Sequence, residues 1–393
     1  MASPFSDPTF YQDRYPTYAA LRERSPVLQI PVDGSTRAAV VVTGYEQARQ
    51  AFAANLSKDT SAYFADRPSG RSLHPAVAHT MLHTDPPAHT RLRRLAARAF
   101  TPTTVDGLRP YIHTLAEHLV GLWEPGDETD LIAHLASPLP VTVICQLLGI
   151  PPADRAAIRI WSTDLFATGD HTRIDAASHA LADYMTQLIA AKRNSPDTAL
   201  LSRLIAVRDG DGGRLSEEEL VSLGLLLLVA GHETTTAAIG NAALALLQHP
   251  DDLEHLRADP HRIPTAVDEL LRYDSPVSIA TWRHAPEAAQ LDETEVAAGT
   301  PVFVCPGAAN RDPRKFTDPD RLDLNRPDAA QHLAFGHGVH RCLGAPLAHA
   351  EIETMLRVLL KRFPGMRLAV PAEELRWRHS RLIRGLESLP VLL

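Results

Sequence analysis

Apolar positions in the first hundred residues follow two different spacings. Helical spacing at 16–24 and 45–54 alternates with apolar, strand-like runs at 27–30 and 39–42, which predicts a small lobe that carries a sheet. From 55 to 84 the periodicity fades into Ser, Asp, Pro and Gly. Because a compact domain seldom keeps so long an irregular segment without a use, we interpret this stretch as a substrate-facing loop.

From 85 to 273 the spacing is helical, with breaks at turns that contain Pro or Gly. Ser216 and Glu219 form a capping-box pattern, which predicts a long helix that starts there and ends near Gln248. Short strand-like runs at 277–280 and 302–304 follow, and then a meander rich in Pro and Asp at 310–327. One more long helix is expected from about Leu343. The pattern predicts a mostly α (α+β) fold with a large helical domain and a small β-rich lobe.

Composition and charge exclude several classes of protein. The chain has 393 residues, 45% hydrophobic and 22% charged, so we expect a single domain over 1–393. The net charge is −8 and the basic residues are scattered, which argues against nucleic acid as a partner. The longest apolar run, Leu220–Gly231, is shorter than the roughly 20 residues of a membrane span, and the N-terminus lacks a signal-peptide pattern. We therefore expect a cytoplasmic protein without a membrane partner.

One of the three cysteines has a distinctive setting. Cys145 and Cys305 lie among apolar residues, which predicts small core side chains. Cys342 follows a glycine-rich loop and precedes a predicted helix. A helix N-terminus lowers the pKa of a thiol, and glycines let a flat ring approach the backbone. This setting favours a thiolate ligand to haem iron, whereas an isolated cysteine is more often structural.

The residues around Cys342 match a known pattern. Phe335, Gly338, His340, Cys342 and Gly344 occupy every specified position of Phe-x-x-Gly-x-His-x-Cys-x-Gly, and the chain resembles the cytochrome P450 family over almost its whole length. The resemblance implies the cytochrome P450 fold and a haem b cofactor whose iron is bound by Cys342. It also implies haem contacts from the same loop, made by Phe335, Gly336, His340 and Gly344.

A second match lies inside the long predicted helix, in Ala230-Gly231-His232-Glu233-Thr234-Thr235. As a bare string, Gly-x-x-Thr in a helix usually reflects only packing. In the family, the positions of Ala230 and Gly231 leave room for dioxygen beside the iron. The resemblance also implies that Glu233 and Thr234 deliver protons to the bound oxygen, so we expect these two residues to be catalytic.

Charged residues supply two further sets of expectations. Glu269 and Arg272 lie three apart on one helical face, a spacing that is usually a solvated surface pair. In the family this pair is buried and contacts a basic residue of the meander, which by position is expected to be Arg321. The resemblance also implies four contacts to the anionic haem propionates, from His89, Arg93, Arg283 and His340.

Substrate and partners are specified least. The resemblance implies pocket residues from the segments Ser61–Leu82 and Phe166–Ile174, and at Leu82, Val277, Ile279, Ala280 and Ile383. It implies electrons from a separate ferredoxin and ferredoxin reductase. As a hypothesis, Arg94, Arg98 and Arg341 form a basic face that binds an acidic electron donor.

The chain is most similar to soluble actinobacterial enzymes that tailor macrolides and other polyketides. We therefore expect a monooxygenase that uses dioxygen to hydroxylate or epoxidise a bulky hydrophobic small molecule. Three alternatives stay open: a peroxygenase that uses hydrogen peroxide, a haem sensor without catalysis, and an enzyme of the same fold that couples or rearranges substrates without inserting oxygen.

Overall fold

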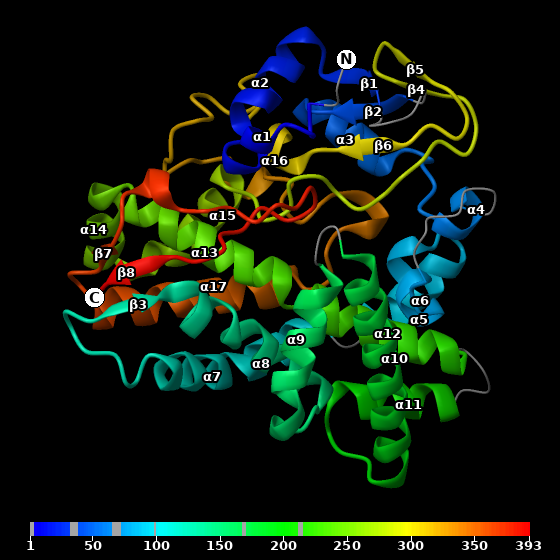
Figure 1. Cartoon of the computed structure of the whole chain (residues 1–393), viewed down its shortest axis with the longest axis horizontal. Helices are drawn as coiled ribbons and strands as arrows, with labels where there is room; N and C mark the ends of the chain where they lie inside the picture. Colours follow the sequence, from blue (N-terminus) through cyan, green and yellow to red (C-terminus); the bar gives the residue numbers. More distant parts are fainter. Residues whose placement is uncertain (1–3, 32–37, 65–71, 98–99, 167–169, 211–214) are drawn as a thin grey trace. The chain divides into compact units, whose positions relative to one another are not determined.

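The computed structural model describes residues 4–31, 38–64, 72–97, 100–166, 170–210 and 215–393 (Figure 1). The chain divides into two compact units. The first comprises 1–57, 108–136 and 234–393, and the second comprises 58–107 and 137–233.

Strand β2 (Ala38–Val42) is the middle strand of the main sheet of the first unit. It pairs antiparallel with β1 (Val27–Pro31) and parallel with β6 (Val302–Val304). Because successive strand residues face opposite sides of a sheet, Val40 and Val41 of β2 belong to different buried clusters. The strand-like runs predicted from the sequence are confirmed as β1 and β2.

Helices cover both faces of this sheet (Figure 1). Helix α3 (Tyr45–Ala53) contributes Tyr45 and Phe52 to one cluster. Helices α1 (Pro8–Gln12) and α2 (Tyr15–Arg24) contribute Phe10 and Tyr18 to the other cluster.

The first unit also contains two smaller sheets and most of the C-terminal helices. The strands are β3 (Glu128–Asp130), β8 (Pro390–Leu392) and β7 (Arg367–Leu368), in that order, and the pair β4 (Ala289–Leu291) and β5 (Thr294–Val296). The helices are α13 (Glu233–Leu247), α14 (Pro250–Ala258), α15 (Ile263–Tyr273), α16 (Pro306–Ala309) and α17 (Ala345–Arg362), with a π-helix at Ile132–Ala136. Single 3-10 turns lie at Pro260–Arg262, Ala329–Gln331, Gly338–His340 and Ala372–Glu374. Helix α7 (Pro102–Leu119) has residues in both units.

The described part of the second unit is helical throughout. Its helices are α4 (Thr60–Phe64), α5 (Pro75–Ala78), α6 (Ala88–Ala97), α8 (Pro138–Leu148), α9 (Arg155–Leu165), α10 (His171–Asn194), α11 (Leu200–Gly210) and α12 (Glu217–Ala230), with 3-10 turns at Met81–His83 and Pro152–Asp154. The predicted capping box is confirmed, since Ser216 Oγ accepts from Glu219 N and Glu219 Oε2 accepts from Ser216 N. Glu219 also pairs with Arg91 of α6.

The long helix predicted from 216 to 248 is interrupted once, between α12 and α13, at Gly231 and His232. A Cβ on Gly231 would lie 2.8 Å from the carbonyl oxygen of Leu227 and 3.0 Å from the Ile144 side chain, so no larger residue fits. Taken together, Glu217–Leu247 is long and apolar enough to span a membrane, but 72% of its most apolar window is buried inside the protein. That burial is typical of a core helix.

Candidate functional site

Cys342 is exposed, whereas Cys145 and Cys305 are completely buried. The predicted core placement of the latter two is confirmed. Burial raises the pKa of the Cys145 thiol to about 12 and also raises the pKa of Cys305. Both therefore keep their protons at neutral pH, which leaves Cys342 as the cysteine whose setting suits a thiolate.

The loop from Phe335 to Cys342, which we call the cysteine loop, is held by backbone hydrogen bonds and contains two glycines in the left-handed region. Cys342 N donates to the Phe335 carbonyl at 2.9 Å, and Gly336 N donates to the Leu333 carbonyl at 2.8 Å. Gly336 and Gly338 have φ of 70° and 72°. A Cβ on Gly338 would also lie 2.8 Å from the Phe52 carbonyl oxygen, so glycine is required there both for φ and for space.

The helix expected after Cys342 begins at Ala345, with Gly344 as its N-cap. No side chain caps this end. A Cβ built on Gly344 would lie 3.9 Å from Cys342 Sγ, so the sulfur is adjacent to the start of α17. The partial positive charge of the helix N-terminus acts at this position and favours the thiolate over the thiol.

Arg283, in the same unit, carries a buried positive charge. Its side chain is 4% exposed, donates to the Thr281 carbonyl at 3.0 Å and stacks on the Phe52 ring at 4.8 Å. Within the described part of the chain no carboxylate forms an ion pair with it. Burial lowers the pKa of Arg283 to about 10. A guanidinium kept in this setting is suited to an anionic ligand.

The other predicted propionate contacts are distributed over both units. His89 and Arg93 lie one turn apart on α6, where His89 is buried and Arg93 is half-buried. Burial, with help from Arg93 and Lys58, lowers the pKa of His89. His340 is half-buried and ends the 3-10 turn of the cysteine loop in the first unit.

Glu233 is buried at 3% exposure, at the start of α13. Its Oε1 accepts a hydrogen bond from Thr163 Oγ1 of α9 at 3.1 Å and lies 3.5 Å from Nε2 of His232. Ala230 ends α12, and Thr234, half-buried, follows Glu233 in α13. The carboxylate is thus held by a hydroxyl, a group that can pass a proton.

Glu269 and Arg272 are both completely buried on α15 and form a bidentate pair, with distances of 2.6 and 2.9 Å. The surface-pair interpretation of this spacing is therefore wrong for this helix. Arg272 also donates to the carbonyls of Asn310 and Pro319, both at 2.8 Å. The pair therefore binds the backbone of the meander.

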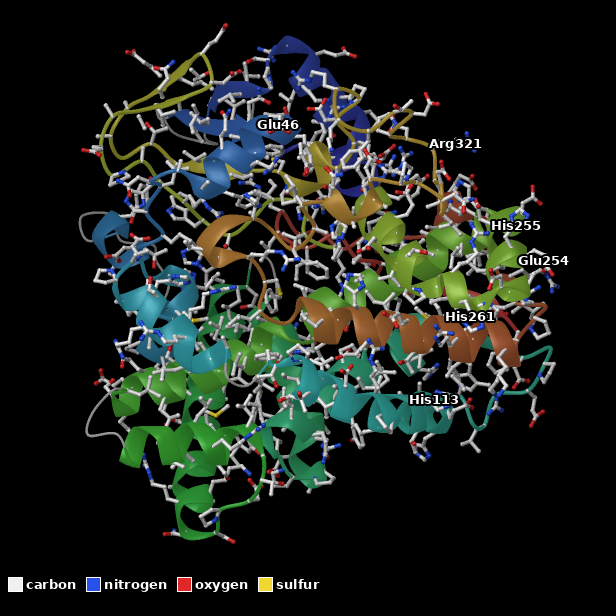
Figure 2. The ribbon with its side chains drawn as sticks, turned by 180° about the vertical axis from the view of Figure 1, so that it is seen from behind. Glu46, His113, Glu254, His255, His261 and Arg321 are labelled. Atoms are coloured by element: carbon white, nitrogen blue, oxygen red, sulfur yellow. The ribbon has the colours of Figure 1, made fainter. Side chains whose placement is uncertain are left out.

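The third member of this network is Arg326 rather than the predicted Arg321. Arg326 Nε lies 3.2 Å from Oε1 and 3.1 Å from Oε2 of Glu269, and its side chain is 6% exposed. Arg321 contributes only its backbone carbonyl, which accepts from Arg272 and from Arg326. Its side chain is exposed at the edge of the molecule (Figure 2). The prediction failed because the meander has irregular turns, so position along it does not specify which arginine faces inward.

The predicted pocket residues have different surroundings. Leu82 is half-buried in the turn Met81–His83. Val277 and Ile383 form an antiparallel bridge, with Ile383 buried. Ile279 packs in the buried cluster of Phe10 and Tyr18. It is therefore a core residue rather than the predicted pocket residue.

Other predicted contacts are exposed, packed or outside the described residues. Ala280 packs against the opposite cluster and donates its N–H to Val304. Arg94 and Arg341 are exposed. Arg98 and parts of the segments 61–82 and 166–174 lie outside the described residues.

Comparisons with known proteins identify the family. A family model described as Cytochrome P450 matches residues 154–366. The chain is 44% identical to cytochrome P450 monooxygenase PikC of Streptomyces venezuelae, over 97% of this chain and 91% of that protein. This chain belongs to the cytochrome P450 family.

Solved cytochromes P450 share its fold. The Bacillus subtilis cytochrome P450 PksS of the bacillaene polyketide synthase is 37% identical, with a TM-score of 0.92 and 100% of both chains covered. The cytochrome P450 CxnD, for C–S bond formation in chuangxinmycin biosynthesis, is 38% identical, with a TM-score of 0.89 and 96% and 94% of the chains covered. The predicted fold class, mostly helical with small sheets, is confirmed.

As a cytochrome P450 monooxygenase, the protein uses a haem whose iron has an axial thiolate. The residues present fit this group. Arg283 is a buried cation without a carboxylate partner among the described residues, as a propionate contact requires. Cys342 is an exposed thiol beside a helix N-terminus.

Sequence patterns missed several residues that the structure brings to these sites. Thr163 of α9 contacts Glu233 from 70 positions away, and Arg326 replaces Arg321. A carboxylate and two imidazoles, Asp268, His332 and His349, also gather beside Phe335. Apart from His332 and Phe335, which are three positions apart, these contacts join residues far apart in sequence, so no local motif signals them.

Proposed function

We propose that Cys342 is the axial thiolate of a monooxygenase that oxidises a bulky hydrophobic natural product of the macrolide or polyketide class. The observation that carries the assignment is the contrast between exposed Cys342 at the start of α17 and the two buried cysteines. Bound there, thiolate-ligated haem supplies the activation of dioxygen. The remaining chemistry, which is binding, orientation and proton supply, falls to side chains of this protein.

His89, Arg93, Arg283 and His340 are proposed to neutralise the two haem propionates. Charge-assisted hydrogen bonds are stronger than neutral ones, most of all when the cation is buried. Arg283 meets this condition, because the residue is 4% exposed. We also propose that the chain forms one cytochrome P450 domain, 1–393.

Glu233 and Thr234 are proposed to supply protons during oxygen activation. Thr163 Oγ1 donates a hydrogen bond to Glu233 Oε1, with 3.1 Å between the two oxygens, so a proton lost from the carboxyl group can be replaced through a neighbouring hydroxyl. Ala230 and Gly231 are proposed to adjoin the dioxygen site. Gly231 tolerates no Cβ, because that atom would lie 2.8 Å from the Leu227 carbonyl oxygen and 3.0 Å from the Ile144 side chain.

Electrons are proposed to come from a ferredoxin and its reductase, in the cytoplasm. The exposed guanidinium groups of Arg94 and Arg341 are suited to an acidic donor. The relatives support a natural-product substrate, because PksS belongs to a polyketide synthase. Leu82, Val277 and Ile383 are the pocket residues that stay in this proposal.

Labelled dioxygen tests the proposed reaction. Candidate polyketides that shift the spin state of the purified holoenzyme are incubated with ferredoxin, reductase, NADPH and ¹⁸O₂. We expect a hydroxylated or epoxidised product with one labelled oxygen atom, and no label when ¹⁸O is supplied as water. A product without oxygen from O₂ would contradict insertion.

Oxidative coupling is the second candidate function. It is favoured by one finding, the similarity to CxnD, whose description names C–S bond formation. In the same ¹⁸O₂ experiment, coupling predicts a product that has lost two hydrogens and gained no label. Turnover supported by hydrogen peroxide alone, and unchanged in Glu233→Gln, would instead identify a peroxygenase.

A further inference from the structure

Three titratable side chains from separate elements meet beside the cysteine loop. Asp268 comes from α15, His349 from α17 and His332 from the turn after residues 329–331. Asp268 Oδ1 lies 3.2 Å from His349 Nε2 and 3.5 Å from His332 Nε2. We refer to Asp268, His332 and His349 as the proximal cluster.

The hydrogen bonding of His332 argues that the cluster holds protons rather than a metal ion. Ala334 N donates to His332 Nδ1 at 3.0 Å, so the proton of the neutral ring is on Nε2, which faces Asp268. A metal ion needs the Nε2 lone pair. Moving the proton to Nδ1 would direct it at the Ala334 N–H and break that bond.

Phe335 connects the cluster to Cys342. The Phe335 ring packs against both imidazoles, with centroid distances of 5.6 Å to His332 and 5.5 Å to His349. The Phe335 carbonyl accepts the Cys342 N–H at 2.9 Å. Asp268 thus orients two rings, the rings fix Phe335, and Phe335 fixes the backbone of Cys342.

Burial and the two imidazoles act on the pKa of Asp268 in opposite directions. Burial pushes the pKa of Asp268 up, but the two imidazoles outweigh it and hold that pKa well below its usual range. Burial, with His349 and Arg341, lowers the pKa of His332, and Asp268 opposes this. Near neutral pH, an ionised Asp268 therefore faces a neutral His332, and the bond from Ala334 stays intact.

We infer that Asp268, acting through His332 and His349, is a positioning residue for the loop that carries Cys342. The inference rests on the proposed role of Cys342 as the iron ligand. The two imidazoles contact the Phe335 ring, and the Phe335 carbonyl accepts the Cys342 N–H, so the cluster acts on the ligand through Phe335.

The test compares three variants of the holoenzyme at pH 7.5. Asp268→Asn removes the charge at nearly constant size, and His349→Gln keeps the charge but removes one ring. Glu254→Gln is the matched control, because Glu254 is an exposed carboxylate of α14 that pairs with Arg257 three positions along the same helix (Figure 2). The readouts are the iron reduction potential and the rate at which the thiolate-type absorption band of the reduced, carbon monoxide-bound protein is lost in dilute urea.

We expect the absorption band to decay roughly tenfold faster in Asp268→Asn and in His349→Gln, because each variant removes one charge-assisted hydrogen bond. The decay rate in Glu254→Gln should equal that of wild type. Both cluster variants should also shift the reduction potential. A shift of the reduction potential in Asp268→Asn alone would indicate a charge effect and would overturn the positioning role. Wild-type values of both readouts in both cluster variants would also overturn it.

Two outcomes separate this inference from the proposed function. If the wild-type protein lacks the thiolate-type band, the assignment of Cys342 fails before the variants are compared. If the wild-type band is present, the variants test the cluster alone. Stoichiometric binding of Zn²⁺ or Ni²⁺ that is lost in His349→Gln would identify a metal site. It would overturn the assignment of a proton to His332 Nε2 and with it the inference.

Discussion

Arg326 Nε lies 3.1 Å from Oε2 of Glu269, and both side chains are almost completely buried. Glu269 already receives two hydrogen bonds from Arg272, so it pairs with two guanidinium groups at once. The network joins α15 to the meander, which leads into the cysteine loop. Removing one cation leaves a buried carboxylate that is incompletely paired.

Arg326→Ala should therefore destabilise the protein by about 3 kcal/mol and reduce its haem content. Arg321→Ala is the control, because the Arg321 side chain is exposed and only its carbonyl takes part. We expect that variant to stay within about 0.5 kcal/mol of wild type. Urea unfolding and haem-to-protein ratios measure both effects, and equal losses in the two variants would refute the assignment of Arg326.

Arg283→Met should affect the apoprotein and the holoprotein in opposite directions. Without haem, a buried charge that no carboxylate of the described residues pairs with is costly, so the variant apoprotein should unfold at higher urea concentration than wild type. With haem, loss of a charge-assisted contact should speed haem transfer to a scavenger protein about tenfold. Slower or unchanged haem transfer would show that Arg283 does not bind a propionate.

The pKa of Arg283 also predicts a pH dependence for the apoprotein. Because burial lowers this pKa to about 10, well below its usual value, the unfolded chain binds more protons than the folded chain above about pH 10. The stability contributed by this group therefore rises as the pH increases above about 10. Arg283→Met should lack this rise. Subtracting its unfolding free energy from that of wild type, at pH 9 and pH 11, isolates the contribution.

Glu233→Gln should lower product formation per NADPH consumed about tenfold, because the amide cannot deliver a proton. Thr163→Val removes the hydroxyl that donates to Glu233 at 3.1 Å, so it should reduce the product formed per NADPH by a smaller factor. Thr186→Val is a suitable control, since its hydroxyl donates to the carbonyl of Ala182 within α10. Product and NADPH are quantified together. A wild-type ratio of product to NADPH in Glu233→Gln would exclude the proposed role of Glu233.

Gly338→Ala should destabilise the holoprotein by more than about 2 kcal/mol. The added Cβ would meet the Phe52 carbonyl oxygen at 2.8 Å, and φ is 72°, a conformation that costs a non-glycine residue about 1–2 kcal/mol by itself. Gly365→Ala is the control, because its Cβ would meet nothing within 4 Å. Thermal unfolding, followed by haem absorption, compares the two. A Gly338→Ala protein with wild-type stability would contradict the loop geometry.

Local patterns predicted the local structure well. The capping box at Ser216 and Glu219 is present because its hydrogen bonds join residues three apart. The glycines at 336 and 338 are required by backbone conformation, which a motif can record. The prediction of one uninterrupted helix missed the break at Gly231, where the packing of Ile144 sets the available space.

Contacts between distant segments were beyond such patterns. The choice of Arg326 over Arg321 depends on how the meander turns against α15, and the placement of Ile279 depends on packing against α1 and α2. The proximal cluster joins residues up to 81 positions apart, Asp268 and His349. Spacing along the chain carries no information about which of these side chains meet.

The central claim is that Cys342 ligates the haem iron, and absorption of the reduced, carbon monoxide-bound protein tests it most directly. Wild type should show the red-shifted Soret band of thiolate-ligated iron. Cys145→Ala should keep this band, because Cys145 is a buried core residue whose thiol pKa is raised to about 12. Cys342→Ala should lose the band while its far-UV circular dichroism stays that of a folded helical protein. A red-shifted band that persists in Cys342→Ala would contradict the account.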